Sequence, residues 1–256
     1  MRPNRLKALW RDCKPATAGW LMTADAYVVE AMANAGFDAL VLDMQHGMGI
    51  GVERAVACLQ AISTTDTVPM VRVPWNEPAH IQYVLDAGAY GVIVPLVNTR
   101  EEAQKAAGAS RYAPLGYRSV GPNRARFYGG HDYFDHANDE IICLVMIEHI
   151  EAVGRVEEIA GTPGIDGFYI GPSDLAVTMG LRPGMDNTDP RHVEACQRVL
   201  DAAKTKGLVA GIHCGGAAEA LRRFEQGFQF CPIATDIGLV ASGAAAAIKT
   251  VRGGQR

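Results

Sequence analysis

The sequence lacks a C-x-x-C pair, an apolar leader and a long hydrophobic run, and each absence excludes a class of protein. Its six cysteines are scattered, which favours a reduced cytoplasmic protein over a disulfide framework or a zinc ribbon. The amino terminus has no apolar core of a signal peptide. The longest weakly polar stretch, residues 239–248, is too short and too rich in glycine and alanine to span a bilayer, so we expect no membrane contact.

An excess of positive charge is also missing, because the formal net charge is −4. A nucleic-acid surface is therefore not expected. The composition, with 48% hydrophobic and 20% charged residues, is typical of a globular protein with a large core. At 256 residues the chain matches one α/β barrel of about 250 residues better than two ordinary domains. No linker or low-complexity tract divides it, so we predict one domain over residues 1–256.

Short apolar runs alternate with amphipathic segments, a pattern typical of βα units and a parallel sheet. We predict eight strands, at residues 16–22, 39–43, 68–72, 91–95, 142–147, 167–170, 209–212 and 229–234. We predict helices between them, among others at residues 52–63, 81–87, 100–108, 153–161, 192–206 and 218–226. Eight such units predict a (β/α)8 TIM barrel of the α/β class. The one long connection, residues 109–140, is expected to be a functional loop or an oligomer contact.

Two carboxylates follow neighbouring predicted strands. Glu148 ends the apolar run 141–147, and Asp174 lies in the turn GPSDL (171–175) after the next strand. Consecutive parallel strands open onto the same rim of a barrel, so these carboxylates can converge on one hard cation. Oxygen ligands suit Mg²⁺ or Mn²⁺ better than zinc. The pattern predicts a metal site and therefore an enzyme, whereas either carboxylate alone would more often be an ion-pair partner.

Other polar residues also end predicted strands and would share this rim, where the catalytic groups of barrel enzymes lie. They are Trp20, Asp43, Gln45, His46, Arg72, Ser173, His213, Thr235 and Asp236. With Glu148 and Asp174 the rim would hold a base, a cation and two carboxylates. His213 is left out of the predicted metal site, because a His-Cys pair at a strand end is a weak metal signal.

Five segments carry a resemblance to a known family: LDMQHG (42–47), VRVPWN (71–76), RYAPLGYR (111–118), MIE (146–148) and GPSDL (171–175). In this order, over nearly the whole chain, they resemble the HpcH/HpaI aldolase family, the metal-dependent pyruvate aldolases related to citrate lyase β-subunits. The family pattern has Glu immediately before the catalytic His, whereas this chain has Gln45. That departure makes the neighbourhood of His46 less acidic.

The resemblance implies a class II aldolase that joins a pyruvate-type 2-oxoacid, pyruvate or hydroxypyruvate, to an aldehyde and gives a 4-hydroxy-2-oxoacid. Mg²⁺ or Mn²⁺, with Co²⁺ as an alternative, would act as a Lewis acid. His46 would be the base, Asp43 would orient it by accepting the other ring N–H, and Arg72 would neutralise the enolate and the carboxylate. The backbone N–H groups of Ser173 and Asp174 would bind the substrate carboxylate.

The implied site is larger than these residues. The catalytic set is His46, Arg72, Asp43 and Asp86; the substrate-binding set is Arg72, Gly171, Pro172, Ser173, Asp174, Trp20 and Arg118; and the metal ligands are Glu148 and Asp174. Asp86 resembles a family position that reaches the site of a neighbouring subunit. Arg118 could instead solvate the long loop, and His46 and Arg72 could be packing and salt-bridge residues.

Rival functions use the same fold. A Schiff-base aldolase needs a desolvated lysine inside the barrel, and none of the six lysines lies on a predicted strand. A zinc hydrolase of the amidohydrolase type needs His-x-His after the first strand, where this chain has Gly19-Trp20-Leu21-Met22. A CoA-thioester lyase of the citrate lyase β type and a non-catalytic barrel scaffold remain as alternatives.

The segment 237–251 is rich in alanine and glycine and is apolar nearly all round, and such helices are normally buried. It could pack as the ordinary eighth barrel helix, or it could be covered by another subunit. The resemblance favours the second interpretation, since family members exchange the last helix and build trimers of dimers. We therefore predict a domain-swapped homohexamer in which Asp86 and the 109–140 loop line a neighbour's site.

Overall fold

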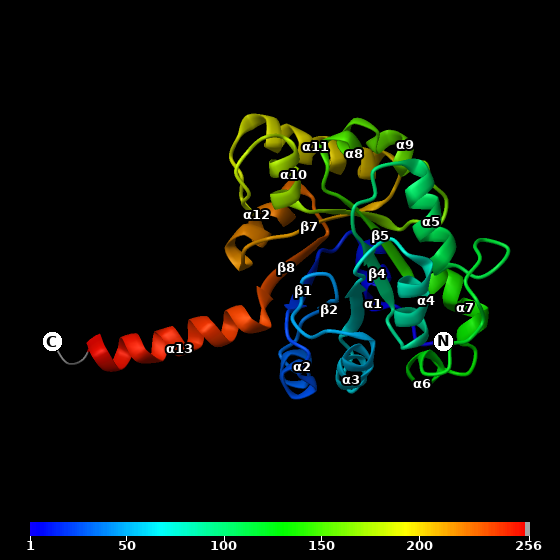
Figure 1. The fold of residues 1–256 in the computed structure, drawn as a ribbon, viewed down its shortest axis with the longest axis horizontal. Helices are drawn as coiled ribbons and strands as arrows, with labels where there is room; N and C mark the ends of the chain where they lie inside the picture. Colours follow the sequence, from blue (N-terminus) through cyan, green and yellow to red (C-terminus); the bar gives the residue numbers. More distant parts are fainter. Residues whose placement is uncertain (254–256) are drawn as a thin grey trace.

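The apolar runs form eight parallel strands that pair in chain order and close into a barrel in the computed structural model, which describes residues 1–253 (Figure 1). The strands are β1 (Ala16–Leu21), β2 (Ala39–Asp43), β3 (Val68–Arg72), β4 (Gly91–Val94), β5 (Ile142–Ile147), β6 (Gly167–Ile170), β7 (Val209–Ile212) and β8 (Phe230–Thr235). The predicted TIM barrel is confirmed, and residues 254–256 of the predicted domain lie outside the described residues. Strands buried on both faces give continuous apolar runs, and all six residues of β5 are buried.

Helices surround the barrel (Figure 1). They are α1 (Arg5–Arg11), α2 (Ala26–Ala33), α3 (Val52–Ile62), α4 (Pro78–Asp86), α5 (Arg100–Ser110), α6 (Ala125–Gly129), α7 (Tyr133–Glu140), α8 (Ile150–Gly154), α9 (Val156–Ala160), α10 (Pro172–Thr178), α11 (Pro190–Thr205), α12 (Ala217–Gln226) and α13 (Asp236–Gly253). Local sequence explains several of their starts. Thr99 and Glu102 form a capping box at α5, and the Asp25 carboxylate accepts two backbone N–H groups at the start of α2.

Two expectations about the helices need correction. The 109–140 connection is not a plain loop, because it contains α6 and α7. The predicted helix 153–161 is two short helices, which meet at Arg155 with φ −113° and ψ 12°, outside the helical region. Both errors involve short helices, which contain too few residues to show a helical hydrophobic periodicity in the sequence.

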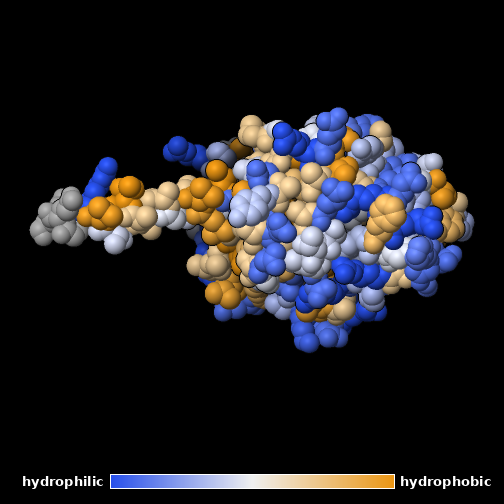
Figure 2. Space-filling model, turned by 90° about the horizontal axis from the view of Figure 1, so that it is seen from below, coloured by the Kyte–Doolittle hydropathy of each residue, from blue (hydrophilic) through white to orange (hydrophobic). Residues whose placement is uncertain are grey.

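α13 extends away from the barrel as a single red arm (Figure 1). Of its residues only Asp236 is buried, and its carboxylate accepts the backbone N–H groups of Met22 and Thr23 at 2.9 and 3.0 Å. Exposed apolar residues follow along the arm: Ile237, Leu239, Val240, Ile248 and Val251. Figure 2 shows hydrophobic side chains on the arm and on the body where the arm leaves it. The helix does not pack on its own barrel as an ordinary eighth helix.

The helices of residues 1–253 differ from membrane-spanning helices. None combines the length and the apolarity that crossing a membrane requires.

Candidate active site

A cavity of about 460 Å³ opens at the carboxyl-terminal end of the barrel. Its wall includes eight of the predicted site residues, which come from the ends of four strands: Trp20, Asp43, His46, Arg72, Gly171, Pro172, Ser173 and Asp174. The cavity lies where barrel enzymes carry out their chemistry. It is therefore the candidate active site.

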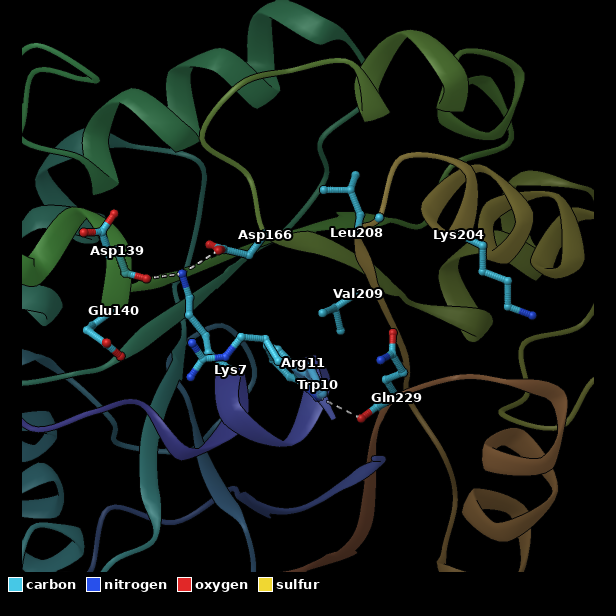
Figure 3. Close-up of a pocket in the computed structure, with 11 residues that line it drawn as sticks. Lys7, Trp10, Arg11, Asp139, Glu140, Asp166, Lys204, Leu208, Val209 and Gln229 are labelled. Carbon is cyan, nitrogen blue, oxygen red and sulfur yellow. Dashed lines mark hydrogen bonds and ion pairs between the residues drawn. The ribbon is translucent and has the colours of Figure 1, made fainter. Parts of the chain in front are cut away.

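A second hollow, of about 570 Å³, lies at the opposite end of the barrel, between α1 and the starts of β7 and β8 (Figure 3). Two of its charged groups pair with each other, since Lys7 Nζ lies 2.8 Å from Asp166 Oδ1, and Lys7 also donates to the backbone carbonyl of Asp139. Trp10 Nε1 donates to the Gln229 carbonyl at 3.1 Å. These contacts attach α1 to the barrel, which is the stabilising role expected of this face.

Asp43 and Arg72 form the floor of the active-site cavity. They are register partners on β2 and β3, so their side chains leave the barrel wall at the same level. Arg72 Nε donates to Asp43 Oδ1 at 2.9 Å, its Nη2 donates to Oδ2, and Trp20 Nε1 donates to Oδ2 at 3.1 Å. Burial opposes ionisation of Asp43, but these hydrogen bonds and the charge of Arg72 outweigh it and lower the pKa of the carboxyl. The pair is a buried, ionised and rigid unit.

The predicted contact between Asp43 and the His46 ring is wrong. Asp43 Oδ1 accepts the backbone N–H groups of Gln45 and His46, at 3.0 and 3.1 Å, and not the imidazole. Both oxygens are occupied by Arg72, Trp20 and these amides. The His46 ring itself is exposed at the mouth, while Gln45 Oε1 is buried and has no hydrogen-bond partner among residues 1–253.

Glu148 is buried beside the cavity, 2% exposed, at the end of β5. Its Oε1 accepts the Leu96 backbone N–H at 2.7 Å. A Cβ on Gly171 would come within 2.5 Å of Glu148 Oε2, so the absence of a side chain there makes room for this carboxylate. Burial is the largest influence and, with the negative charge of Asp174, raises the pKa of Glu148 to about 7, although the Leu96 amide works against it.

Asp174 is exposed and lines the cavity from the first turn of α10, so one carboxylate is buried and the other faces the opening. The α10 start at Gly171 has no side-chain cap, which leaves its first N–H groups for another partner. Across residues 1–253, the His, Cys, Asp and Glu side chains form no group of three or more that could hold a metal. The donor set is thus limited to two carboxylates, which fits a hard cation whose other positions are open to water or substrate oxygens.

Asp86 and Arg118 are not brought to this cavity. Arg118 Nη2 donates to Asp86 Oδ1 at 2.6 Å, and its Nη1 donates to the Tyr133 hydroxyl at 3.1 Å. The Arg118 side chain is fully buried, whereas the Asp86 side chain keeps 29% exposure. Arg118 is a structural residue that holds the 109–140 connection against α4, and substrate binding by it in this cavity is not supported.

His213 lines the cavity although the predicted site omitted it. Its Nδ1 lies 3.0 Å from the Tyr169 hydroxyl, and its ring meets Trp20 edge-on at 4.6 Å. Burial and the charge of Arg72 lower the pKa of His213 to about 4. Its position directly after β7 was visible in the sequence, but the partner on β6 was not.

Comparisons with known proteins agree with this geometry. A family model described as HpcH/HpaI aldolase/citrate lyase matches residues 17–242. The chain is 39% identical over 249 residues to a hydroxypyruvate/pyruvate aldolase of Rhizorhabdus wittichii, with 97% of this chain and 99% of the relative covered. It is 36% identical over 242 residues to a 5-keto-4-deoxy-D-glucarate aldolase of Escherichia coli, with 94% and 93% covered.

The fold is matched by solved structures as well. A HpcH/HpaI aldolase/citrate lyase family protein from Burkholderia cenocepacia has a TM-score of 0.89 at 33% identity, with 97% of this chain and 99% of that chain covered. The family match spans most of the chain, and both curated relatives are aldolases. The protein is therefore a carbon–carbon lyase, and the chain belongs to the HpcH/HpaI aldolase/citrate lyase family.

Proposed function

We propose that this enzyme is a divalent-metal-dependent aldolase that interconverts a 4-hydroxy-2-oxoacid with a pyruvate-type 2-oxoacid and an aldehyde. The observation that carries the proposal is the arrangement at one cavity of the Asp43–Arg72 ion pair, the His46 ring and the carboxylates of Glu148 and Asp174. The sequence identity to a hydroxypyruvate/pyruvate aldolase supports pyruvate or hydroxypyruvate as the donor.

Glu148 and Asp174 would hold the cation, and the donor set suits Mg²⁺ or Mn²⁺, with Co²⁺ as an alternative. When bound, the cation supplies Lewis acidity at the 2-oxo group. The fit is supported by the Glu148 carboxylate, whose Oε2 lies in the space left by Gly171, and by the mutual repulsion of the two carboxylates, which a cation would relieve.

The other groups would bind the donor and move its proton. Arg72 offers a permanent positive charge, held in orientation by Asp43, to the substrate carboxylate and to the enolate oxygen. The first N–H groups of α10, at Ser173 and Asp174, can bind the carboxylate, with Gly171 and Pro172 shaping the turn. His46 would take the proton that leaves C3, or the aldol hydroxyl proton in cleavage, and Trp20 would form an apolar wall.

A lyase acting on a CoA thioester is the alternative within the same family. Turnover assays with a panel of free 2-oxoacids and aldehydes, run beside acyl-CoA substrates and with and without EDTA, separate the two. The proposal expects aldol turnover that stops with EDTA and returns with Mg²⁺ or Mn²⁺. Turnover of acyl-CoA substrates alone would refute it.

We also propose that the protein assembles as a homo-oligomer, a hexamer built as a trimer of dimers with exchanged α13 helices. The support is the row of exposed apolar residues on an arm that its own barrel leaves uncovered (Figures 1 and 2). In such an assembly the partly exposed Asp86 would lie at a neighbour's site. The proposal places the enzyme in the cytoplasm, in keeping with six free cysteines.

A further inference from the structure

His213 carries a polar atom that nothing else in the described chain uses. Its Nδ1 is taken by the Tyr169 hydroxyl, and Trp20 packs against the ring, so the orientation of the imidazole is restrained. Nε2 makes no hydrogen bond within residues 1–253, and it is not fully buried. Since His213 lines the cavity, Nε2 is available to a ligand there.

The chemistry of this atom selects its partner. The lowered pKa of His213 keeps the ring neutral at pH 7, so it offers no positive charge to a carboxylate. Depending on whether the Tyr169 hydroxyl donates to or accepts from Nδ1, Nε2 is either a donor or an acceptor. A hydroxyl group can satisfy both cases, because it donates one hydrogen bond and accepts others.

The position of His213 fits the donor substrate. Its backbone N–H donates to the Ile170 carbonyl at 3.1 Å, so it follows β7 directly beside the β6 turn that holds Ser173 and Asp174. Neighbouring strands lie about 4.8 Å apart. A 2-oxoacid whose carboxylate is bound at that turn, as proposed above, would have a substituent of its third carbon within reach of the next strand end, and the aldehyde would enter from the open mouth of the cavity.

We propose that His213, positioned by Tyr169, is a specificity-determining residue that binds the 3-hydroxyl group of a hydroxylated 2-oxoacid donor and so favours hydroxypyruvate over pyruvate. The inference rests on the proposed aldolase function, and it deepens that function by naming the donor class. Pyruvate has no group at this carbon for Nε2 to bind, so it serves as the internal reference.

The test compares wild type with His213→Leu, which removes the polar atom, and His213→Gln, which keeps a hydrogen-bonding group. For each protein, kcat/KM is measured with hydroxypyruvate and with pyruvate, using one aldehyde and saturating Mn²⁺. We expect His213→Leu to lower the hydroxypyruvate-to-pyruvate ratio about tenfold, the value of one hydrogen bond, and His213→Gln to keep part of it. An equal change for both donors in His213→Leu would overturn the inference.

Two further measurements separate this inference from the proposed function and from misfolding. Titration calorimetry with each donor, in Mn²⁺ and without aldehyde, should show the same loss of preference in His213→Leu, even if no turnover occurs. Tyr169→Phe, which removes only the positioning hydroxyl, should shift the ratio in the same direction by a smaller factor. Absence of aldol turnover with both donors in wild type would refute the proposed function, whereas an unchanged binding ratio would refute the role of His213.

Discussion

At the scale of single residues, Glu148 is buried and has the Asp174 carboxylate nearby, and both features oppose its negative charge. The proposed cation would compensate the charge of both carboxylates. We predict that Glu148→Gln and Asp174→Asn each abolish aldol turnover while circular dichroism shows an intact fold, because each removes ligand charge from the proposed metal site and neither changes the size of the side chain. The exposed Glu151→Gln is the matched control and should keep full activity. Full activity of the wild type after exhaustive chelation would contradict metal dependence.

His46 is exposed, and Asp43 accepts its backbone N–H and not its ring N–H. The imidazole is therefore free to contact a substrate in the cavity. We predict that His46→Ala lowers kcat by about 10²–10⁴, the usual contribution of a general base, with little loss of metal affinity. The exposed His131→Ala should behave as wild type. Exchange of the C3 protons of pyruvate in D₂O reports the step directly, and an unchanged exchange rate in His46→Ala would assign the base to another group.

His213 should also make the free energy of unfolding depend on pH in the acid range. Its pKa falls from 6.5 to about 4 on folding, mainly by burial, so the unfolded chain binds more protons between these values. The free energy of unfolding should therefore decrease as the pH drops from about 6.5 to 4, by about 3 kcal/mol from this group. Urea unfolding across this window should show a shallower pH dependence in His213→Gln, and an identical slope would contradict the assignment.

At the scale of elements, the turn between β6 and α10 places Gly171 against Glu148. We predict that Gly171→Ala lowers metal affinity and turnover while the barrel still folds, because the new methyl group would displace the Glu148 carboxylate. The matched control is Gly154→Ala at the end of α8, where a Cβ meets nothing within 4 Å. Metal titration of the two variants checks this, and equal affinities would show that Glu148 is free to move.

The strands were the most predictable elements. Five of the eight have the predicted bounds, and the others differ by a residue at one or both ends, since runs buried on both faces stand out in a sequence. Short helices were the least predictable. The pair α6 and α7 in the 109–140 connection and the break at Arg155 each span too few turns to show a helical period.

At the scale of the whole molecule, α13 leaves apolar residues uncovered. We predict that deletion of the residues after Gly238 destroys both assembly and activity, because the arm is proposed to cover a partner and to complete its site. Lys249 is not one of the exposed apolar residues of α13, so the control variant Lys249→Ala should keep the wild-type assembly. Small-angle scattering at assay concentration measures the mass, and a fully active monomer would refute the assembly.

The order of elements and the residues at the rim could be derived from the sequence alone. Strand ends in a parallel barrel converge by chain topology, so a residue at the end of an apolar run or a few residues after it must lie on the carboxyl-terminal rim. His46, Arg72 and Asp174 line one cavity for this reason, and Glu148 lies beside it.

The partners of these residues required the tertiary structure. Register between β2 and β3 pairs Asp43 with Arg72 and so removes Asp43 from the His46 ring. Arg118 is buried against Asp86 and therefore does not reach the cavity. The Tyr169 hydroxyl on β6 contacts Nδ1 of His213, so that of the two ring nitrogens only Nε2 lacks a partner among the described residues. A local sequence pattern determines on which face and at which end a side chain lies, but hydrogen-bond partners come from distant segments, whose distances and directions only the packed chain sets.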